Sequence, residues 1–195
     1  MTTALSIQQR AVGEGRPPFV IAEIGTNHNR DLTTACALVR GIAAAGCDAA
    51  KFQIYEPEEI VSGSVSAKDY GLDTLYGEIS AQEMFRRHLQ TPKEWFPELR
   101  DLCHELGIAC GATIHGDNGR AWAKAIGIDF VKIASMDHTN LPLLRSLVNE
   151  VTAPVLISFG LAELPDIDAA IATLRPHAPG VGLFHCVAVY PPAPD

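Results

Sequence analysis

The chain is poor in positive charge: 15 Lys and Arg stand against 23 Asp and Glu, which leaves a net charge of −8. This balance argues against a nucleic-acid surface or an acidic membrane as the partner. No apolar run reaches membrane-spanning length, and residues 1–18 hold no basic-then-apolar signal. The five cysteines form no C-x-x-C pair, which is typical of reduced thiols. We therefore expect a cytoplasmic protein with no nucleic-acid and no membrane partner.

The chain does have enough apolar residues for a core. Its 195 residues are 47% hydrophobic and 19% charged, as in an ordinary α/β enzyme of one domain. Strand and helix patterns alternate throughout, which predicts a parallel sheet. We predict a first strand at the start of 19–29 and later strands over 49–55, 108–115, 130–134, 154–159 and 181–189, with helices over 33–45, 91–107, 117–126, 141–150 and 165–174.

Two segments have more specific signals. Residues 56–90 are a long polar excursion, which we interpret as a loop with some helix of its own and a functional role. After it, Thr91-Pro92-Lys93-Glu94 predicts a helix start in which Thr91 caps the helix and Glu94 completes a capping box. Glycines at 46, 107 and 127 each predict the end of a helix.

The stretch Phe19–Asn29 is unusual because an apolar run leads directly into Glu23. The run predicts a buried parallel strand rather than a half-exposed one. An ionised carboxylate is costly to bury without a partner, so Glu23 is either one half of a structural ion pair or a group with a chemical role. The polar residues that follow the strand favour a chemical role.

Two parallel architectures are compatible with this alternation. A doubly wound sheet should have a glycine-rich phosphate turn after its first strand, but Gly25 is the only glycine there. A (β/α)8 barrel instead places polar residues at the carboxyl ends of many strands. That pattern is present in or just after the predicted strands, at Glu23, Lys51, Gln53, Thr113, Lys132, Ser135, Ser158, His185 and Tyr190. We therefore predict a TIM-type barrel, of which this chain holds six βα units where a full barrel needs about eight in about 250 residues.

Two lysines indicate the chemistry of the barrel interior. Lys51 and Gln53 lie two apart in one strand and so face the same side, whereas Phe52 faces the helices. Lys132 occupies a similar position in a later strand. Two buried ammonium groups need anions and Glu23 can neutralise only one, so we expect a phosphate or carboxylate ligand. Neutral donors for this ligand would be Thr113, Ser135 and Ser158, although each alone is more typical of a backbone-bonding residue at a strand end.

Several motifs, in order and with consistent spacing, resemble the sialic acid synthase family, which includes the N-acetylneuraminate, legionaminate and pseudaminate synthases and related spore-coat polysaccharide proteins. The resemblance runs from about Phe19 to the last residue. Its motifs are Ile21–Gly25 with Asn27-His28, Lys51–Gln53, Lys132–Ser135, Thr139–Leu144, and His185–Val187 with Tyr190-Pro191.

The resemblance implies condensation of phosphoenolpyruvate with an N-acylated hexosamine, such as N-acetylmannosamine, to a nine-carbon 2-keto acid and phosphate. By analogy, Glu23, Lys51 and Lys132 would be catalytic. The lysines with Thr113, Ser135 and Ser158 would hold phosphoenolpyruvate, and Glu23, Gln53 and Tyr190 would face the sugar, with Asp137 also among the substrate-binding residues. The family uses a divalent metal, Mn or Mg, as a Lewis acid. A homo-oligomer, most simply a dimer, is also implied.

The sequence departs from the family pattern on the side where the sugar would lie. Ile114-His115 replaces Pro-Phe, Phe159 replaces a small residue, Asp137 replaces glutamate, and Ala188 replaces serine or asparagine. The two metal-binding histidines would come from strands beyond Asp195. We expect residues 1–18 to be an extension and 19–195 an incomplete barrel, without its last two βα units and the C-terminal antifreeze-like domain. We therefore expect little synthase activity from these 195 residues alone and exposed edges on the first and sixth strands that favour association.

Two other functions remain open from the sequence. A class I aldolase would use Lys132 or Lys51 to form a Schiff base with its substrate. A non-catalytic remnant would instead bind a sugar or a partner chain. The sequence does not decide which acceptor sugar is used.

Overall fold

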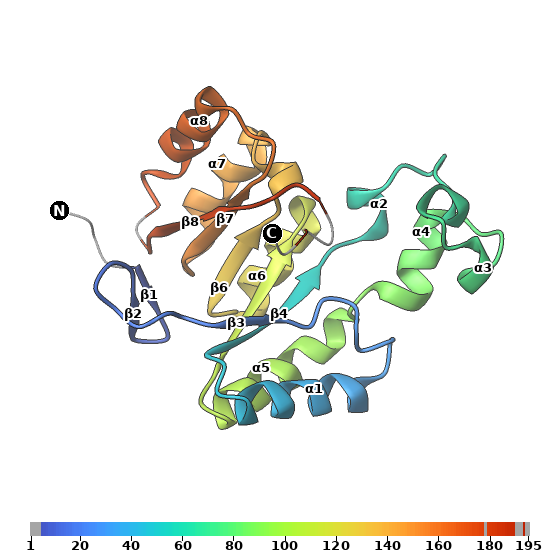
Figure 1. The fold of residues 1–195 in the computed structure, drawn as a ribbon, viewed down its shortest axis with the longest axis horizontal. Helices are drawn as coiled ribbons and strands as arrows, with labels where there is room; N and C mark the ends of the chain where they lie inside the picture. Colours follow the sequence, from blue (N-terminus) through green and yellow to red (C-terminus); the bar gives the residue numbers. More distant parts are fainter. Residues whose placement is uncertain (1–4, 178, 190–192, 194–195) are drawn as a thin grey trace.

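The fold is built on a six-stranded parallel sheet, seen in a computed structural model that describes residues 5–177, 179–189 and 193 (Figure 1). Each strand pairs with the next one along the chain, in the order β3-β4-β5-β6-β7-β8. A doubly wound sheet reverses its order at a switch point, whereas a barrel sheet adds strands in sequence. The predicted α/β barrel-type fold is therefore confirmed, as a curled half-barrel of six strands in which the described residues place helices after each of the first five. Its strands are β3 (Ile21–Glu23), β4 (Ala49–Ile54), β5 (Ala109–Ile114), β6 (Phe130–Ile133), β7 (Val155–Phe159) and β8 (Val181–His185).

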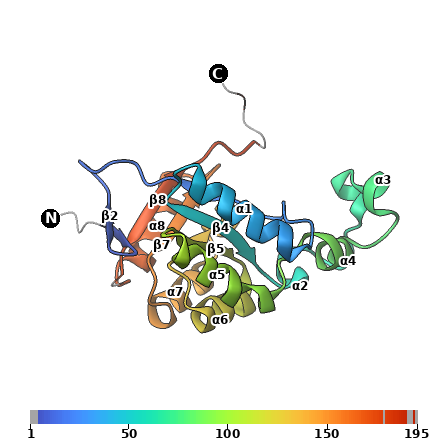
Figure 2. The same cartoon turned by 90° about the horizontal axis from the view of Figure 1, so that it is seen from below.

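A layer of helices covers the outer face of the half-barrel (Figures 1 and 2). Neighbouring helices pack against each other, α1 beside α5, α6 beside α7 and α7 beside α8. Each of the three predicted terminal glycines has a positive φ, between 71° and 79°, as a left-handed helix end requires. None of the described helices combines the length and apolar character needed to cross a membrane. The helices are α1 (Leu32–Ala44), α5 (Phe96–Glu105), α6 (Gly116–Ile126), α7 (Leu141–Glu150) and α8 (Leu164–Leu174).

The excursion between β4 and α5 is a chain of short helical turns that extends away from the sheet (Figure 1). This confirms a loop with some helix of its own. The predicted role of Thr91 is wrong, because its hydroxyl lies 2.8 Å from Nε2 of the buried His28 and caps no helix. The turns are α2 (Pro57–Ile60), η1 (Ala67–Tyr70), α3 (Asp73–Tyr76), α4 (Ala81–Met84), η2 (Phe85–Leu89) and η3 (Lys93–Trp95).

The main hydrophobic core lies between the sheet and the helical layer. Alternate residues of β4 point outward, so that Phe52 and Ile54 are fully buried against the helices. Phe52 meets the ring of Phe96 edge-on, with centroids 5.8 Å apart. The predicted alternation is confirmed, and it leaves the intervening side chains for the inner face of the half-barrel.

A smaller core closes the amino end of the inner face. The hairpin of β1 (Leu5–Ile7) and β2 (Arg10–Val12), which the sequence analysis did not predict, packs there with Ala49, Ala109, Phe130 and Leu156. The ring of Phe130 lies over Gly111, where even a methyl group would come within 2.1 Å of it. Residues 5–12 therefore close the amino end of the half-barrel.

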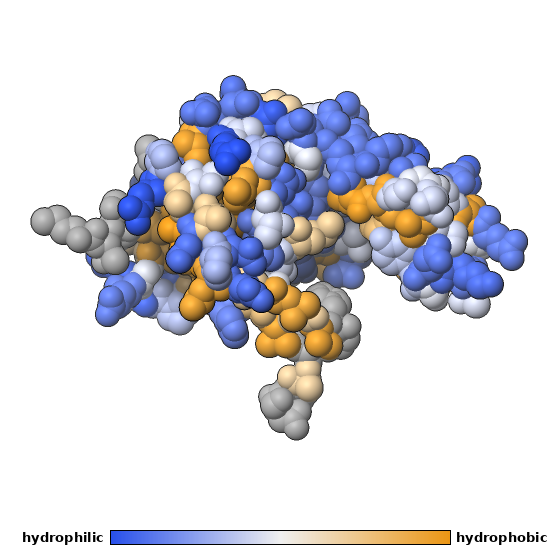
Figure 3. Space-filling model, turned by 90° about the horizontal axis from the view of Figure 1, so that it is seen from above, coloured by the Kyte–Doolittle hydropathy of each residue, from blue (hydrophilic) through white to orange (hydrophobic). Residues whose placement is uncertain are grey.

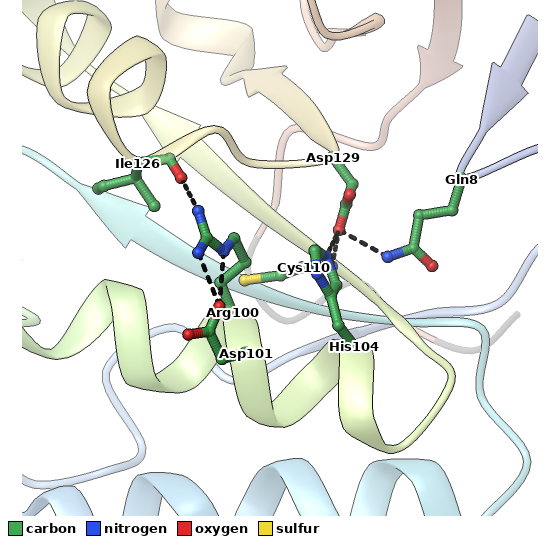
Figure 4. A network of polar contacts seen from close by, with 7 residues as sticks. All are labelled: Gln8, Arg100, Asp101, His104, Cys110, Ile126 and Asp129. Carbon is green, nitrogen blue, oxygen red and sulfur yellow. Dashed lines mark hydrogen bonds and ion pairs between the residues drawn. The ribbon is translucent and has the colours of Figure 1, made fainter.

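One carboxylate ties this hairpin to the sheet (Figure 4). A single oxygen of Asp129 accepts hydrogen bonds from the Gln8 side chain at 3.0 Å and from the Cys110 backbone N–H at 2.7 Å, and it lies 2.9 Å from Nε2 of His104. The same acid thus joins the hairpin, α5 and β5 at the amino end of the sheet.

The two outer strands of the described sheet, β3 and β8, each pair on one side only. We expected a buried first strand, and this expectation is wrong: β3 has three residues, and the Glu23 side chain is 41% exposed because nothing in the described sheet covers its other side. Exposed apolar side chains lie where the chain runs along and leaves β8 (Figure 3). They are Leu183, Phe184, Val187 and Val189.

Candidate functional site

The inner face of the half-barrel carries a cavity of about 270 Å³ above the smaller core. Its base is apolar and its upper wall carries the charged side chains that the sequence analysis selected. Four of the predicted site residues line it together, from four different strands. The lining residues are Phe19, Ile21, Glu23, Lys51, Lys132, Leu156, Ser158, Phe184 and Cys186.

Lys51 is the most enclosed cation of this cavity. It forms an ion pair with Glu23, and its Nζ donates a hydrogen bond of 2.7 Å to the hydroxyl of the buried Thr113. Burial lowers the pKa of Lys51, while the Glu23 carboxylate opposes this shift and the nearby Lys132 ammonium adds to it. A bound anion would remove the repulsion between the two lysines.

Lys132 and Ser158 complete the polar wall. Lys132 is only half-buried, and among the described residues no carboxylate lies within ion-pair distance of it. Ser158 is 1% exposed, and its hydroxyl has no hydrogen-bond partner among the residues that the structure describes. A buried hydroxyl without a partner costs free energy unless a ligand or a water binds it. The wall therefore offers two donors to an anion.

Glu23 and Gln53 approach each other beside Gly25, which has a φ of 54°. A Cβ atom at Gly25 would lie 3.2 Å from Oε1 of Glu23 and 3.6 Å from Nε2 of Gln53. Glycine therefore suits both the backbone angle and the space between these side chains. Glu23 faces the cavity on one side and the open edge of β3 on the other.

Ser135 and Asp137 lie nearer the carboxyl ends of the strands. The Ser135 hydroxyl is 3.5 Å from the position that a Cβ of Gly160 would take, between β6 and β7. Asp137, in the turn η4 (Ser135–Asp137), does not line the cavity and instead lies 2.9 Å from Nδ1 of His115. Tyr190 is outside the described residues.

Sequence reasoning missed two parts of this region. The apolar base of the cavity is formed by Phe19, Ile21 and Leu156. Strand alternation predicts that these side chains point inward, but it does not predict that they meet in one cavity. The other part is the contact between His115, noted only as a departure from the family pattern, and Asp137, which the sequence placed among the substrate-binding residues without this partner. His185 ends β8 and is exposed.

No group of three or more His, Cys, Asp or Glu side chains within residues 5–177, 179–189 and 193 is arranged to hold a metal ion. The described residues thus do not fit the divalent metal that the resemblance implies.

The sequence matches a model of the NeuB family over residues 38–195. A curated relative, the spore coat polysaccharide biosynthesis protein SpsE of Bacillus subtilis, is 32% identical over 98% of this chain and 50% of its own length. The N,N'-diacetyllegionaminic acid synthase of Legionella pneumophila is 30% identical over 92% of this chain and 51% of its own length.

Solved structures show the same similarity. The N-acetylneuraminic acid (sialic acid) synthetase of Leptospira borgpetersenii, determined in complex with citrate, superposes with a TM-score of 0.84 at 27% identity. That match covers 98% of this chain and 62% of the synthetase. The chain spans about half the length of the curated relatives it matches.

Proposed function

The chain belongs to the NeuB family, and from this premise we propose that its half-barrel binds phosphoenolpyruvate for condensation with an N-acylated hexosamine. The names of the matched relatives, which include a legionaminic acid synthase and a sialic acid synthetase, support this class of reaction. The product would be a nine-carbon 2-keto sugar acid, with phosphate released.

One observation supports the proposal above all others: Lys51 and Lys132 line the same small cavity. Of these two lysines, only Lys51 has a carboxylate partner among the described residues, so the cavity keeps an excess of positive charge. Phosphoenolpyruvate carries both a phosphate and a carboxylate, and it is small enough for a cavity below the roughly 300 Å³ at which sites for drug-sized ligands begin. Charge-assisted hydrogen bonds to such an anion are among the stronger polar interactions.

In the proposed complex, Lys51, Lys132 and Ser158 donate to the anionic groups of phosphoenolpyruvate. Thr113 holds the Lys51 ammonium in place, and Ser135 adds a donor nearer the strand ends. The partnerless Ser158 hydroxyl supports a ligand at this position. The lysines would then stabilise the phosphate charge throughout the reaction.

The acceptor would lie on the side of Glu23 and Gln53, and the family resemblance adds Tyr190 as a residue that contacts it. The electron pair of the enol double bond forms the new bond to the aldehyde carbon of the open-chain sugar, and the aldehyde oxygen takes up a proton. Water adds to the resulting oxocarbenium-like centre and gives a proton to Glu23. The C–O bond to phosphate then breaks, the phosphate takes up the proton of the new hydroxyl, and a ketone remains at the former enol carbon.

Calorimetric titration of the chain with phosphoenolpyruvate tests the anion site. We expect binding that weakens with added salt and weakens further in Lys132→Met, whereas Lys124→Met, on helix α6, should match the unmodified chain. Absence of binding, or equal affinity in Lys132→Met, would refute the proposal.

Borohydride reduction in the presence of pyruvate tests the aldolase alternative. Condensation through phosphoenolpyruvate forms no Schiff base, so we expect no increase in protein mass. A stable adduct on Lys51 or Lys132 would instead favour the aldolase.

A further inference from the structure

His115 and Asp137 form a hydrogen-bonded pair near the carboxyl ends of the strands. Nδ1 of His115 lies 2.9 Å from the Asp137 carboxylate, and the two side chains are only 11% and 16% exposed. The pair joins the end of β5 to the turn after β6. A mostly buried imidazole held by a carboxylate has a defined orientation and tautomer.

The backbone directs His115 toward the inner face of the half-barrel. His115 has extended φ and ψ, −130° and 137°, so the alternation of β5 continues through it and places its side chain on the face of Thr113. Its backbone N–H donates to the Ile54 carbonyl at 3.2 Å, which extends the ladder with β4. Two residues of strand span about 7 Å, so His115 lies that much nearer the carboxyl ends than the Thr113 hydroxyl that binds Lys51.

Neighbouring side chains restrict the imidazole further. The ring of the buried Tyr55 meets it edge-on, with centroids 6.3 Å apart and an angle of 70° between the rings. Asp137 is held in turn by a backbone hydrogen bond from its N–H to the Ala134 carbonyl at 3.0 Å. Because Nδ1 faces the carboxylate, Nε2 is the polar atom of the ring left for another molecule.

We propose that His115, oriented by Asp137, accepts a hydrogen bond from a hydroxyl of the acceptor sugar and thereby helps to select among N-acylated hexosamines. This inference rests on the proposed function, because it places the sugar beyond an anion held by Lys51 and Lys132. Nδ1–H donates to Asp137 in the neutral ring, which leaves Nε2 with a lone pair that suits a hydroxyl donor. His115 is then a specificity-determining residue, and Asp137 is the residue that positions it.

Nitrogen NMR of the full chain, labelled at histidine and saturated with phosphoenolpyruvate, tests this directly. We expect His115, assigned by the loss of its signals in His115→Phe, to show the Nδ1–H tautomer. Titration with N-acetylmannosamine, N-acetylglucosamine and N-acetylgalactosamine should shift its Nε2 signal with at least one sugar. In Asp137→Asn the preference for this tautomer should weaken and the sugar-dependent shift of the Nε2 signal should weaken with it, whereas a purely structural contact gives no sugar-dependent shift in either protein.

Binding measurements supply the second test. His115→Phe and His115→Gln should weaken binding of the sugar that shifts the Nε2 signal about tenfold. They should leave the affinity for phosphoenolpyruvate unchanged. His104→Gln is the matched control, since its imidazole also lies 2.9 Å from a carboxylate but at the amino end of the sheet (Figure 4). It should change neither affinity.

The outcomes separate this inference from the proposed function. If phosphoenolpyruvate binds but no sugar moves the His115 signal, or if both His115 variants keep full sugar affinity, the inference is wrong and the proposed function stands. If phosphoenolpyruvate itself does not bind, both are wrong.

Discussion

Replacing Lys132 with methionine should weaken binding of phosphoenolpyruvate without unfolding the chain. Lys132 is half-buried and, among the described residues, has no carboxylate partner, so its charge is available to a ligand. Hydrogen bonds to charged groups contribute about 1.5–3 kcal/mol, which corresponds to an affinity loss of about 10- to 150-fold. Methionine keeps much of the apolar stem that packs on the sheet.

The same substitution should also act on Lys51, because the Lys132 ammonium is one of the causes that lower its pKa. Removing that charge should raise the pKa of Lys51 toward its ordinary value. Calorimetric titration gives the affinity, and the pH dependence of binding gives the Lys51 pKa. Unchanged affinity together with an unchanged pH dependence would show that the two lysines do not share one anion site.

Three further predictions concern the charge and the packing around the site. Burial lowers the pKa of Lys51 from its ordinary 10.5. Between the lowered pKa and 10.5 the folded chain therefore binds fewer protons than the unfolded chain. The free energy of unfolding, measured in urea titrations, should rise with pH across this window. The rise should disappear in Lys51→Met, and an equal slope in both proteins would contradict the assignment. Phe130→Ala should lower the free energy of unfolding in urea by about 3–5 kcal/mol, because it leaves a cavity over Gly111. Phe184→Ala, at an exposed position, should lower it far less. Equal losses would show that the smaller core is not close-packed. Asp129→Asn should lower the free energy of unfolding by about 1–3 kcal/mol and speed amide hydrogen exchange in β1 and β2. The control Asp101→Asn changes a carboxylate that contacts Arg100 at the surface, and it should leave that exchange unchanged. Unaltered exchange in Asp129→Asn would mean that the hairpin is held by apolar contacts alone.

Much of the fold follows from local patterns in the sequence. Period-two alternation in 49–54 places Lys51 and Gln53 on one face and Phe52 on the other, because successive side chains of a strand point to opposite sides. Helix ends at Gly46, Gly107 and Gly127 follow from the left-handed backbone that glycine adopts without strain. Such features need only a few consecutive residues.

Other features depend on contacts between distant residues. Thr91 has the sequence signal of a helix cap, but its hydroxyl meets the buried His28, 63 positions away. The β1–β2 hairpin has no strong local signal and is defined by its contact with Phe130 and its bond to Asp129. In each case a tertiary partner outweighs or replaces the local preference.

By itself, the sequence determined the βα alternation, the inward direction of the two lysines and the family motifs, because each depends on spacing along one segment. Only the tertiary structure decided that Lys51 and Lys132 share one cavity, that Glu23 pairs with Lys51, and that His115 binds Asp137. The reason is geometric: the curvature of the sheet and the register between its strands fix these distances, and neither is encoded within a single strand.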